Sequence, residues 1–331
     1  MFSNKSGRKK TANLKKVIGI LLVLISLIAS IAFREIYINR EDQEANPPQE
    51  STSSGEGQTI TEGNLMLHMI DVGQADSFLL IQDDCIALID CGTRSTGEDV
   101  VEYLKNMGIT EIDYVIGTHP HDDHMGGMYD VITNFEIGTI IIPEIEEGEI
   151  TTNWYMKLMK EIKDGNYTVD HPELKEIYNL GYASMKIIGP ISEPKDNTNN
   201  YSIVLKVTFG EMDIIMTGDA EKDVEEEILA SRENLDAEIL KVGHHGSDTS
   251  NTKEWLDAIT PQYALISTKV GNKYNHPIKS VMELLEERKI EVYRTDENGS
   301  VIATITSNNV TFNCEPGDYL SGEEVEEVKS K

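Results

Sequence analysis

The sequence predicts a mixed α/β protein in which two β-sheets pack face to face and helices cover their outer faces, an αββα sandwich. Two observations carry this prediction. Apolar runs of strand length follow one another closely early in the chain, whereas later runs alternate with segments of helical periodicity. Closely spaced strands pair as hairpins and alternating elements form parallel units, so the mixture favours two sheets over a single doubly wound sheet.

The expected elements follow from apolar patterning along the chain. Strand-like runs span residues 65–72, 77–82, 86–92, 114–119, 138–143, 183–190, 202–210, 212–219, 238–245, 263–269 and 292–296. Helical periodicity predicts helices at 97–107, 153–163, 221–230, 251–259 and 278–289.

These elements predict one domain, residues 64–314, without an internal repeat. A polar stretch that contains Pro47-Pro48 and a Ser/Gly cluster, residues 41–63, is typical of a linker. Residues 315–331 are acidic and end in Lys331, and we expect them to form a frayed acidic tail.

The first part of the chain predicts a membrane-targeting segment. Residues 1–16 hold six basic side chains and no acidic one, and residues 17–33 are seventeen positions without a charge. That length fits either a single-pass transmembrane anchor or a secretion signal that is cleaved. A basic flank stays cytoplasmic, so both alternatives make the body extracytoplasmic. A buried core helix is a third alternative, which the flanking cations disfavour.

Charge and cysteine content limit the possible functions. The chain has 58 acidic against 29 basic side chains, a formal net charge of −29. Such a body repels phosphate backbones at long range, which disfavours general nucleic-acid adhesion but permits a local site. Cys85, Cys91 and Cys314 give no disulfide framework, because the first two lie six residues apart on one expected strand.

A dense group of metal-ligand residues follows the strand at 114–119. The segment THPHDDHMGG places His119, His121, Asp123 and His124 within six positions. Imidazoles and a carboxylate at this spacing suit Zn²⁺ or a borderline metal such as Mn²⁺ or Fe, and three such rings packed together are unfavourable without a metal. The pattern predicts a metal centre.

Two later strand ends supply further ligand types. Asp219 ends MDIIMTGD, and His244 and His245 end EILKVGHH. Active sites on α/β sheets gather at the carboxyl ends of strands, and one carboxylate can bridge two ions. Asp219 taken alone suits a helix N-cap before EKDVEEEIL equally well.

The His-x-His-x-Asp-His signature at 119–124 resembles the metallo-β-lactamase fold superfamily. More narrowly, the chain resembles the extracytoplasmic hydrolase domain of ComEC-type competence proteins and its stand-alone relatives. The matching stretches are DVGQADS (71–77), LIDCG (88–92), THPHDDHMGG (118–127), NNYSIVLKVTFG (199–210), TGDAE (217–221), LKVGHHGSDTS (240–250), the region from Pro261 through Ser267 to Asn275-His276-Pro277, and YRTDENGS (293–300). They occur in the family's order over nearly all of 65–305.

The resemblance implies a hydrolase with one or two Zn²⁺ or Mn²⁺ ions. The implied ligands are His119, His121, Asp123, His124, a bridging Asp219 and His244, with His245 as the alternative to His244. Asp123 or Asp219 is expected to orient the attacking water, and Lys241, His245 and the backbone of 243–246 to stabilise oxyanion charge. Substrate contacts or supporting positions are expected at Asp71, Gln74, Asp76, Ser202, Ser247 and His276.

The sequence departs from the family pattern at two places. A further histidine often lies between the signature and the bridging aspartate, but the corresponding strand here reads Asn200-Tyr201-Ser202. We therefore expect one ion to be less fully coordinated. The family's Gln-Gly-Asp is Gln74-Ala75-Asp76 here, and alanine adopts positive φ less easily than glycine, so we expect a differently shaped loop.

The favoured hypothesis is an extracytoplasmic metal-dependent phosphodiesterase or nuclease that acts on single-stranded DNA or another phosphodiester. One alternative is an envelope phosphodiesterase such as a phosphorylcholine esterase, which the same fold supports. Another is a non-catalytic binding module with a vestigial metal site. Membrane contact is expected only through the N-terminal helix, and the sequence identifies no protein partner.

The charge asymmetry of residues 1–33 gives a testable topology. Reporter fusions joined after Gly63 should show active alkaline phosphatase and inactive β-galactosidase, because basic flanks remain in the cytoplasm and the chain beyond is exported. The reverse pair of activities would place the body in the cytoplasm.

Overall fold

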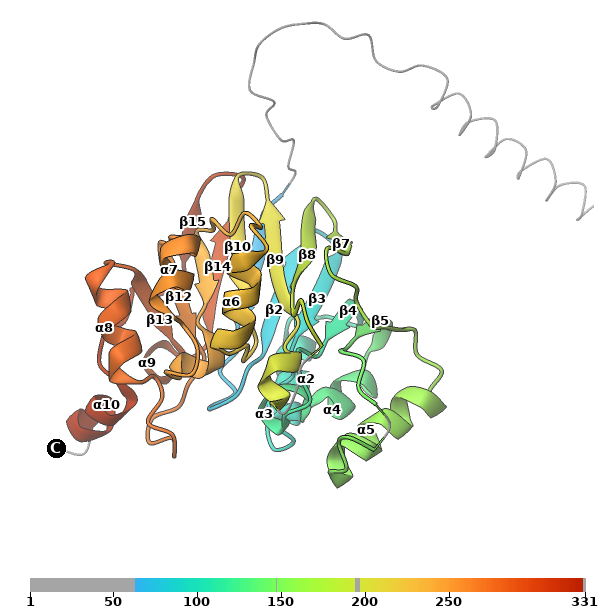
Figure 1. Ribbon diagram of the computed structural model, residues 1–331. Helices are drawn as coiled ribbons and strands as arrows, with labels where there is room; N and C mark the ends of the chain where they lie inside the picture. Colours follow the sequence, from blue (N-terminus) through green and yellow to red (C-terminus); the bar gives the residue numbers. More distant parts are fainter. Residues whose placement is uncertain (1–62, 147, 194–196, 330–331) are drawn as a thin grey trace, which may run out of the picture. The chain divides into compact units, whose positions relative to one another are not determined.

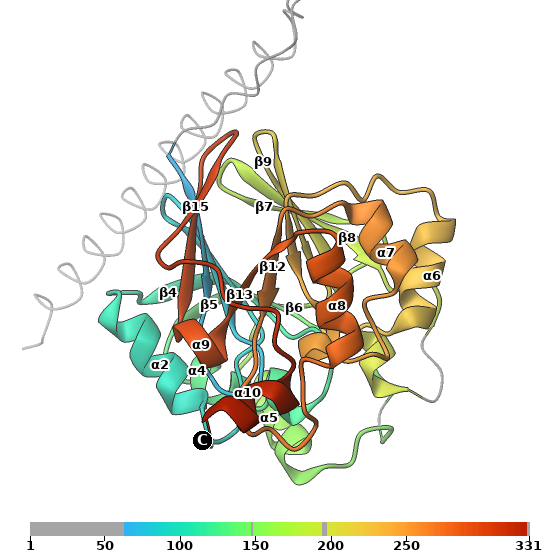
Figure 2. The same cartoon turned by 90° about the vertical axis from the view of Figure 1, so that its left-hand side faces the viewer.

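The computed structural model describes residues 63–146, 148–193 and 197–329. These residues form two β-sheets packed face to face, with helices on both outer faces (Figure 1 and Figure 2). The predicted αββα architecture is thus confirmed. Residues 1–16, the 17–33 segment and the 41–62 part of the predicted linker lie outside the described residues. Within the described ranges, no helix is long and apolar enough to cross a membrane.

The first sheet has eight strands in the order β15-β14-β1-β2-β3-β4-β5-β6. Its first hairpins are antiparallel, whereas β3, β4, β5 and β6 run parallel. The strands are β1 (Leu65–Met69), β2 (Phe78–Gln82), β3 (Cys85–Ile89), β4 (Glu111–Ile116), β5 (Glu136–Ile141), β6 (Val169–Asp170), β14 (Val301–Ile305) and β15 (Val310–Phe312).

The second sheet has seven strands in the order β13-β12-β11-β10-β9-β8-β7. Strands β7 to β10 are antiparallel, and β10 to β13 are parallel. The strands are β7 (Ile177–Leu180), β8 (Ala183–Gly189), β9 (Val204–Phe209), β10 (Met212–Met216), β11 (Ile239–Lys241), β12 (Tyr263–Ile266) and β13 (Glu291–Arg294).

Helices cover the two sheets on opposite sides, as Figure 2 shows. The apolar faces of α2 (Gly97–Asn106), α4 (Met128–Ile132) and α5 (Asn153–Asp164) pack on the first sheet. Those of α6 (Lys222–Ala230), α7 (Lys253–Ile259) and α8 (Lys279–Glu287) pack on the second. The remaining helices are short: α3 (Asp122–Met125), η1 (Thr198–Tyr201), η2 (Gly243–Gly246), α9 (Thr295–Asn298) and α10 (Gly322–Lys329).

The central core lies between the sheets and is built from alternate residues of their strands. Leu65, Leu67 and Met69 of β1 face it together with Leu205 and Val207 of β9. This period-2 alternation on both sheets is what the apolar runs of the sequence require. The three cysteines are free, and Cys91 is buried in the layer between the first sheet and its helices.

The structure differs from the sequence expectation mainly near the C-terminus. Within residues 315–331, expected to be a frayed tail, α10 is formed and its Val325 is buried. The buried Arg294 guanidinium pairs with Asp296 at 2.9 Å and donates to the carbonyl of Leu320, which holds the segment before α10 against the domain. Strands β6, β7, β14 and β15 also lay outside the expected runs, because they are short or carry alternate polar side chains.

Candidate metal centre

The signature histidines lie just beyond the carboxyl end of β4. His119 is the third residue after the strand and is buried, His121 precedes α3, and Asp123 and His124 belong to α3. His119 Nε2 lies 3.0 Å from His121 Nδ1, and the ring centroids of His119 and His124 are 4.1 Å apart. The fold therefore brings the three imidazoles together as predicted.

Asp90, at the end of β3, orients the signature. Its Oδ2 lies 2.7 Å from His124 Nδ1, and its carboxylate accepts hydrogen bonds from the backbone and hydroxyl of Thr118, both at 2.8 Å. A carboxylate on Nδ1 fixes the proton there and leaves Nε2 free to bind a metal. The LIDCG stretch does not by itself assign this role to Asp90. The signal was a single charge at the end of an otherwise apolar strand.

Asp219 lies at the centre of the cluster, after β10. Its Oδ2 is 3.2 Å from His124 Nε2, 3.5 Å from His244 Nε2 and 3.8 Å from His245 Nε2. Glu221, rather than Asp219, occupies the N-cap position of α6. The N-cap alternative for Asp219 is therefore wrong, and its carboxylate is directed at the imidazoles.

Lys241, at the end of β11, neutralises two of the buried carboxylates. Its Nζ lies 2.6 Å from Asp76 Oδ2 and 3.6 Å from Asp219 Oδ1, and it donates to the carbonyl of Gly218 at 2.7 Å. Burial opposes the ammonium form, but Asp76 and Asp219 more than offset this and raise the pKa of Lys241. With its ammonium enclosed in this way, the geometry favours a charge-balancing role over the predicted oxyanion contact.

The histidine pair at η2 sits on an unusual turn. His244 and His245 both have left-handed φ angles, 50° and 54°, followed by Gly246 at 86°. Non-glycine residues adopt this conformation rarely, and strained backbone of this kind gathers at functional sites. The turn directs the two neighbouring rings to different places.

His245 meets the signature more fully than His244 does. Its Nδ1 lies 2.9 Å from the carbonyl of Ser267, and its Nε2 lies 3.7 Å from Asp123 Oδ2. His244 reaches Asp219 at one edge, and its Nδ1 lies 3.1 Å from Thr249 Oγ1. The geometry therefore favours His245, the alternative, over His244 as the last ligand.

A buried network holds this turn in place. Asn251 accepts a hydrogen bond from the Gly243 N–H at 2.8 Å and donates to the carbonyls of Gly243 and Ser247 at 2.9 and 3.1 Å. The Glu225 carboxylate of α6 in turn accepts from the Asn251 and Thr252 backbones at 2.5 and 2.9 Å. Sequence reasoning did not identify either residue, and nothing local in the sequence marks them.

The donor set fits a divalent cation. Several buried side-chain atoms that could bind a metal have no hydrogen-bond partner within the described ranges: His124 Nε2, His245 Nε2, Asp219 Oδ1 and Asp76 Oδ1. Buried polar atoms are rarely left so unless something binds them. Three sets have ligand atoms within 4.8 Å of one another, and all include His124: His119, His124 and Asp219; Asp123, His124 and His245; and Asp76, Asp90 and His124. His121 falls outside these sets, although its Nδ1 faces His119.

The cluster's negative charge alters its proton affinities. Burial opposes charge on His124, but Asp219 and Asp90 more than offset this and raise its pKa well above the usual value. Burial also opposes charge on His245, whose pKa Asp219 and Asp76 raise to about 10. For His119 burial dominates and lowers the pKa well below the usual value. Positive charge is thus stabilised at the side where the carboxylates converge.

The structure shows what occupies the two positions at which the sequence departs from the family pattern. Ser202 stands near the site where a further histidine is often found: its Oγ lies 3.3 Å from His119 Nδ1 and accepts the Asp219 N–H at 3.0 Å. Ser202 thus positions two candidate metal ligands, His119 and Asp219, without adding the imidazole that a further histidine would supply. In the Gln74-Ala75-Asp76 loop the positive φ falls on Gly73, at 76°, and Ala75 is not among the left-handed residues.

The other residues expected to contact substrate fall into two groups. Asp71 accepts from the Gly73 N–H at 3.1 Å and Ser247 lies 3.1 Å from Thr249 Oγ1, so both shape loops. Gln74 lines a cleft beside Asp123. The ring of His276 lies 5.5 Å from that of His244, centroid to centroid.

Comparison with known proteins agrees with this geometry. The family model described as the Metallo-beta-lactamase superfamily matches residues 70–269. The chain belongs to this superfamily, and its cluster is that of a metallo-hydrolase that uses divalent metal ions. Within the superfamily it is related to ComEC-type competence proteins.

Three relatives illustrate the range. ComE operon protein 3 of Bacillus subtilis is 29% identical over 266 residues, 75% of this chain and 34% of that protein. Competence protein ComA of Neisseria gonorrhoeae is 26% identical over 248 residues, 74% of this chain and 33% of that protein. The chain thus spans about a third of these relatives. A probable metallo-hydrolase of Methanocaldococcus jannaschii is 30% identical over 154 residues, 44% of this chain and 66% of that protein.

A solved structure shares the fold. The diiron β-hydroxylase CmlA of Streptomyces venezuelae has a TM-score of 0.51 at 13% identity, and the match covers 74% of this chain and 54% of that one. At this identity the likeness concerns the fold alone.

The geometry of the histidine pair predicts unequal effects on metal binding. We expect His245→Ala to weaken Zn²⁺ or Mn²⁺ binding at least ~10-fold more than His244→Ala does, because only His245 joins Asp123 and His124. Competition with a metal-indicator dye, together with elemental analysis of chain purified without chelators, measures this. Equal losses, or the greater loss with His244→Ala, would contradict the assignment.

The network below the turn predicts an indirect effect. Asn251→Ala leaves buried groups of Gly243 and Ser247 unpaired, so it should lower the free energy of unfolding by about 1–3 kcal/mol. The same change should weaken metal affinity about 10-fold or more, because the ligands' support is lost. Chemical denaturation and dye competition test both. The exposed Asn134→Ala is the matched control, and an equal effect there would refute a specific role for Asn251.

Proposed function

We propose that this chain hydrolyses phosphodiesters in nucleic acid, with single-stranded DNA as the substrate, as a metal-dependent hydrolase outside the cytoplasm. The observation that carries the proposal is that two donor sets, His119–His124–Asp219 and Asp123–His124–His245, meet at His124, because adjacent ions suit an in-line displacement at phosphorus. Kinship with competence proteins supports DNA as the substrate. The basic-then-apolar order of residues 1–33 supports the location.

The chain's own groups would each make a distinct contribution. Divalent ions held here supply Lewis-acid activation of the phosphoryl group and of water. Asp219 is kept ionised, since burial alone would raise its pKa but His124 and His245 lower it well below the usual value. An ionised Asp219 could bind two ions at once and accept a hydrogen bond from the attacking water. Asp123, partly exposed at the same edge, is placed to orient that water.

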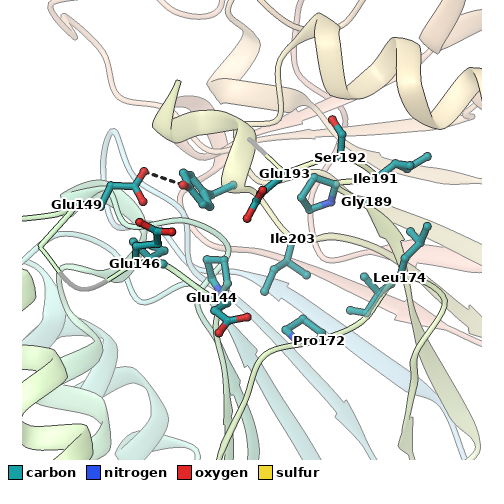
Figure 3. Close-up of a pocket in the computed structure, with 15 residues that line it drawn as sticks. Glu144, Glu146, Glu149, Pro172, Leu174, Gly189, Ile191, Ser192, Glu193 and Ile203 are labelled. Atoms are coloured by element: carbon teal, nitrogen blue, oxygen red, sulfur yellow. Dashed lines mark hydrogen bonds between the residues drawn. The ribbon is translucent and has the colours of Figure 1, made fainter. Parts of the chain in front are cut away.

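A second candidate function rests on a different cleft, of about 840 Å³, shown in Figure 3. Four glutamates line it, Glu144, Glu146, Glu149 and Glu193, and none of its described lining residues is basic. Its Tyr201 and Ile203 are the chain neighbours of Ser202, whose Oγ lies 3.3 Å from His119 Nδ1, although, among the residues that the structure describes, no candidate metal ligand lines the cleft itself. Such a surface repels a polyanion and favours a substrate that carries a cationic head group such as choline. It supports a phosphorylcholine-type esterase as the alternative.

The role of Asp219 gives the decisive test. Asp219→Asn keeps the shape but removes the charge. Hydrolysis of both single-stranded DNA and bis-p-nitrophenyl phosphate should therefore fall by about 10²-fold or more. The exposed Asp99→Asn on α2 is the control and should match wild type. Activity of Asp219→Asn near wild type would contradict the bridging role.

The same assay separates the candidate substrates. Hydrolysis of DNA supports the nuclease, whereas hydrolysis of p-nitrophenyl phosphorylcholine with DNA left intact supports the esterase. A metal-loaded wild type inert on every phosphodiester would contradict both and favour a binding module.

A further inference from the structure

We infer that the loop at residues 269–276, between β12 and α8, is the subsite that holds the nucleic-acid strand beside the scissile phosphodiester. In this subsite Tyr274 stacks on a nucleobase, and Lys269 and Lys273 contact phosphates. The inference rests on the proposed function, and it names the residues that would make a nucleic acid the preferred substrate.

The loop forms one wall of a cleft that includes the metal cluster's exposed edge. The cleft has a volume of about 420 Å³, and its lining residues are Gln74, Asp122, Asp123, Lys269, Gly271, Asn272, Lys273 and Tyr274. Because Asp123 also belongs to a donor set with His124 and His245, a strand in this cleft would lie next to the candidate metal ions.

The charges that face the cleft favour an anion. Lys269 and Lys273 are exposed, and neither forms a salt bridge within the described part of the chain. Of the two acidic residues that line the cleft, Asp122 pairs with Arg94 at 2.6 Å and Asp123 is directed towards His245. The carboxylate of Glu326 on α10 lies near Gly271 at the edge of the loop. Two free ammonium groups therefore remain, on a protein whose formal net charge is −29.

The loop presents an aromatic surface together with these cations. Tyr274 is 49% exposed and lies in an otherwise polar loop. Its ring stacks on that of His276 at 5.4 Å and 25°, and the His276 ring meets that of His244 at 5.5 Å. Lys273 Nζ lies 4.6 Å from the Tyr274 centroid. An aromatic platform beside cations is how proteins hold single strands without sequence preference.

The loop is braced from below, so this surface is preformed. Asn272 is buried; its Nδ2 donates to the carbonyls of His276 and Lys269 at 2.7 and 2.9 Å, and its Oδ1 accepts from the His276 and Tyr274 N–H groups at 3.0 and 3.1 Å. The Thr268 hydroxyl lies 3.1 Å from the carbonyl of His276 and 3.0 Å from Gln74 Oε1. A side chain in the loop's centre thus satisfies its backbone and leaves Lys273 and Tyr274 outside.

The acidic cleft also favours binding of a nucleic-acid strand at the 269–276 loop. Its four glutamates lie on the Ser202 side of the cluster, whereas the lysines lie on the Asp123 side. A polyanion approaching the metal cluster meets repulsion on one side and attraction on the other, so the 269–276 loop is the side on which it would bind.

The test measures binding apart from hydrolysis. In full-length chain carrying Asp219→Asn, Tyr274→Ala should weaken binding of fluorescein-labelled oligothymidine about 10-fold by anisotropy, and Tyr274→Phe should restore it. With an abasic oligonucleotide of equal length, the loss should disappear, because no base remains to stack. Lys269→Ala with Lys273→Ala should reduce the slope of log affinity against log salt by about 1.4, two phosphates at about 0.7 each.

Two substitutions of exposed residues outside the loop serve as controls. Tyr182→Ala, 51% exposed at the β7–β8 turn, and Lys163→Ala on α5 should bind oligothymidine like the parent chain. The inference is overturned if Tyr274→Ala binds like the parent, if Tyr182→Ala loses as much, if the abasic strand shows the same loss, or if the parent binds no oligonucleotide.

Failure of the proposed function would look different. If wild-type chain binds oligothymidine through Tyr274 but leaves DNA intact, the proposed hydrolysis fails and the subsite stands. If wild type cleaves DNA at a rate that the Tyr274 and lysine substitutions leave unchanged, the subsite alone is refuted.

Discussion

The buried ion pair between Lys241 and Asp76 is the interaction on which the rest of the site depends. Lys241 ends a central strand of the second sheet, and Asp76 belongs to the loop between the first two strands of the first sheet, so the pair joins both halves of the sandwich. The Asp76 backbone also donates to the carbonyl of Asp123 at 2.9 Å and accepts from Gly92 at 2.8 Å. Removing one partner would leave a buried charge unmatched at the point where the two halves meet.

The two-sheet fold could be predicted because its core strands are apolar and consecutive. Strands β9 to β12 are dominated by apolar residues, and amphipathic α2, α6 and α8 have clear periodicity. The missed strands depend on distant partners: β14 pairs Ile305 with Leu65, so its register is invisible to local pattern. The helix α10 was missed for the same reason, since its contacts are with distant partners: Arg294 donates to the Leu320 carbonyl, and Lys279 pairs with Glu324.

The candidate site was only partly accessible from sequence. The clustering of His119, His121 and His124 is a matter of spacing, and spacing is what a sequence displays. Which of His244 and His245 faces the metal cluster depends on the left-handed backbone angles of the turn. Two adjacent histidines in a sequence do not indicate those angles. Asp90 and Glu225 position the site through hydrogen bonds to residues at least 26 positions away in the sequence, and Asn251 does so across a turn. Such contacts can be identified only in the folded structure.

The left-handed pair at His244 and His245 has a consequence for the lifetime of the protein. Each such residue costs about 1–3 kcal/mol of folding free energy, so the chain forgoes stability to direct these rings. Ions that bind only the folded state return stability in proportion to their concentration over the dissociation constant. The abundance of intact protein would then follow the supply of divalent metal in its compartment. Loss of the ions would remove this stabilisation and make the strained turn more susceptible to unfolding and proteolysis.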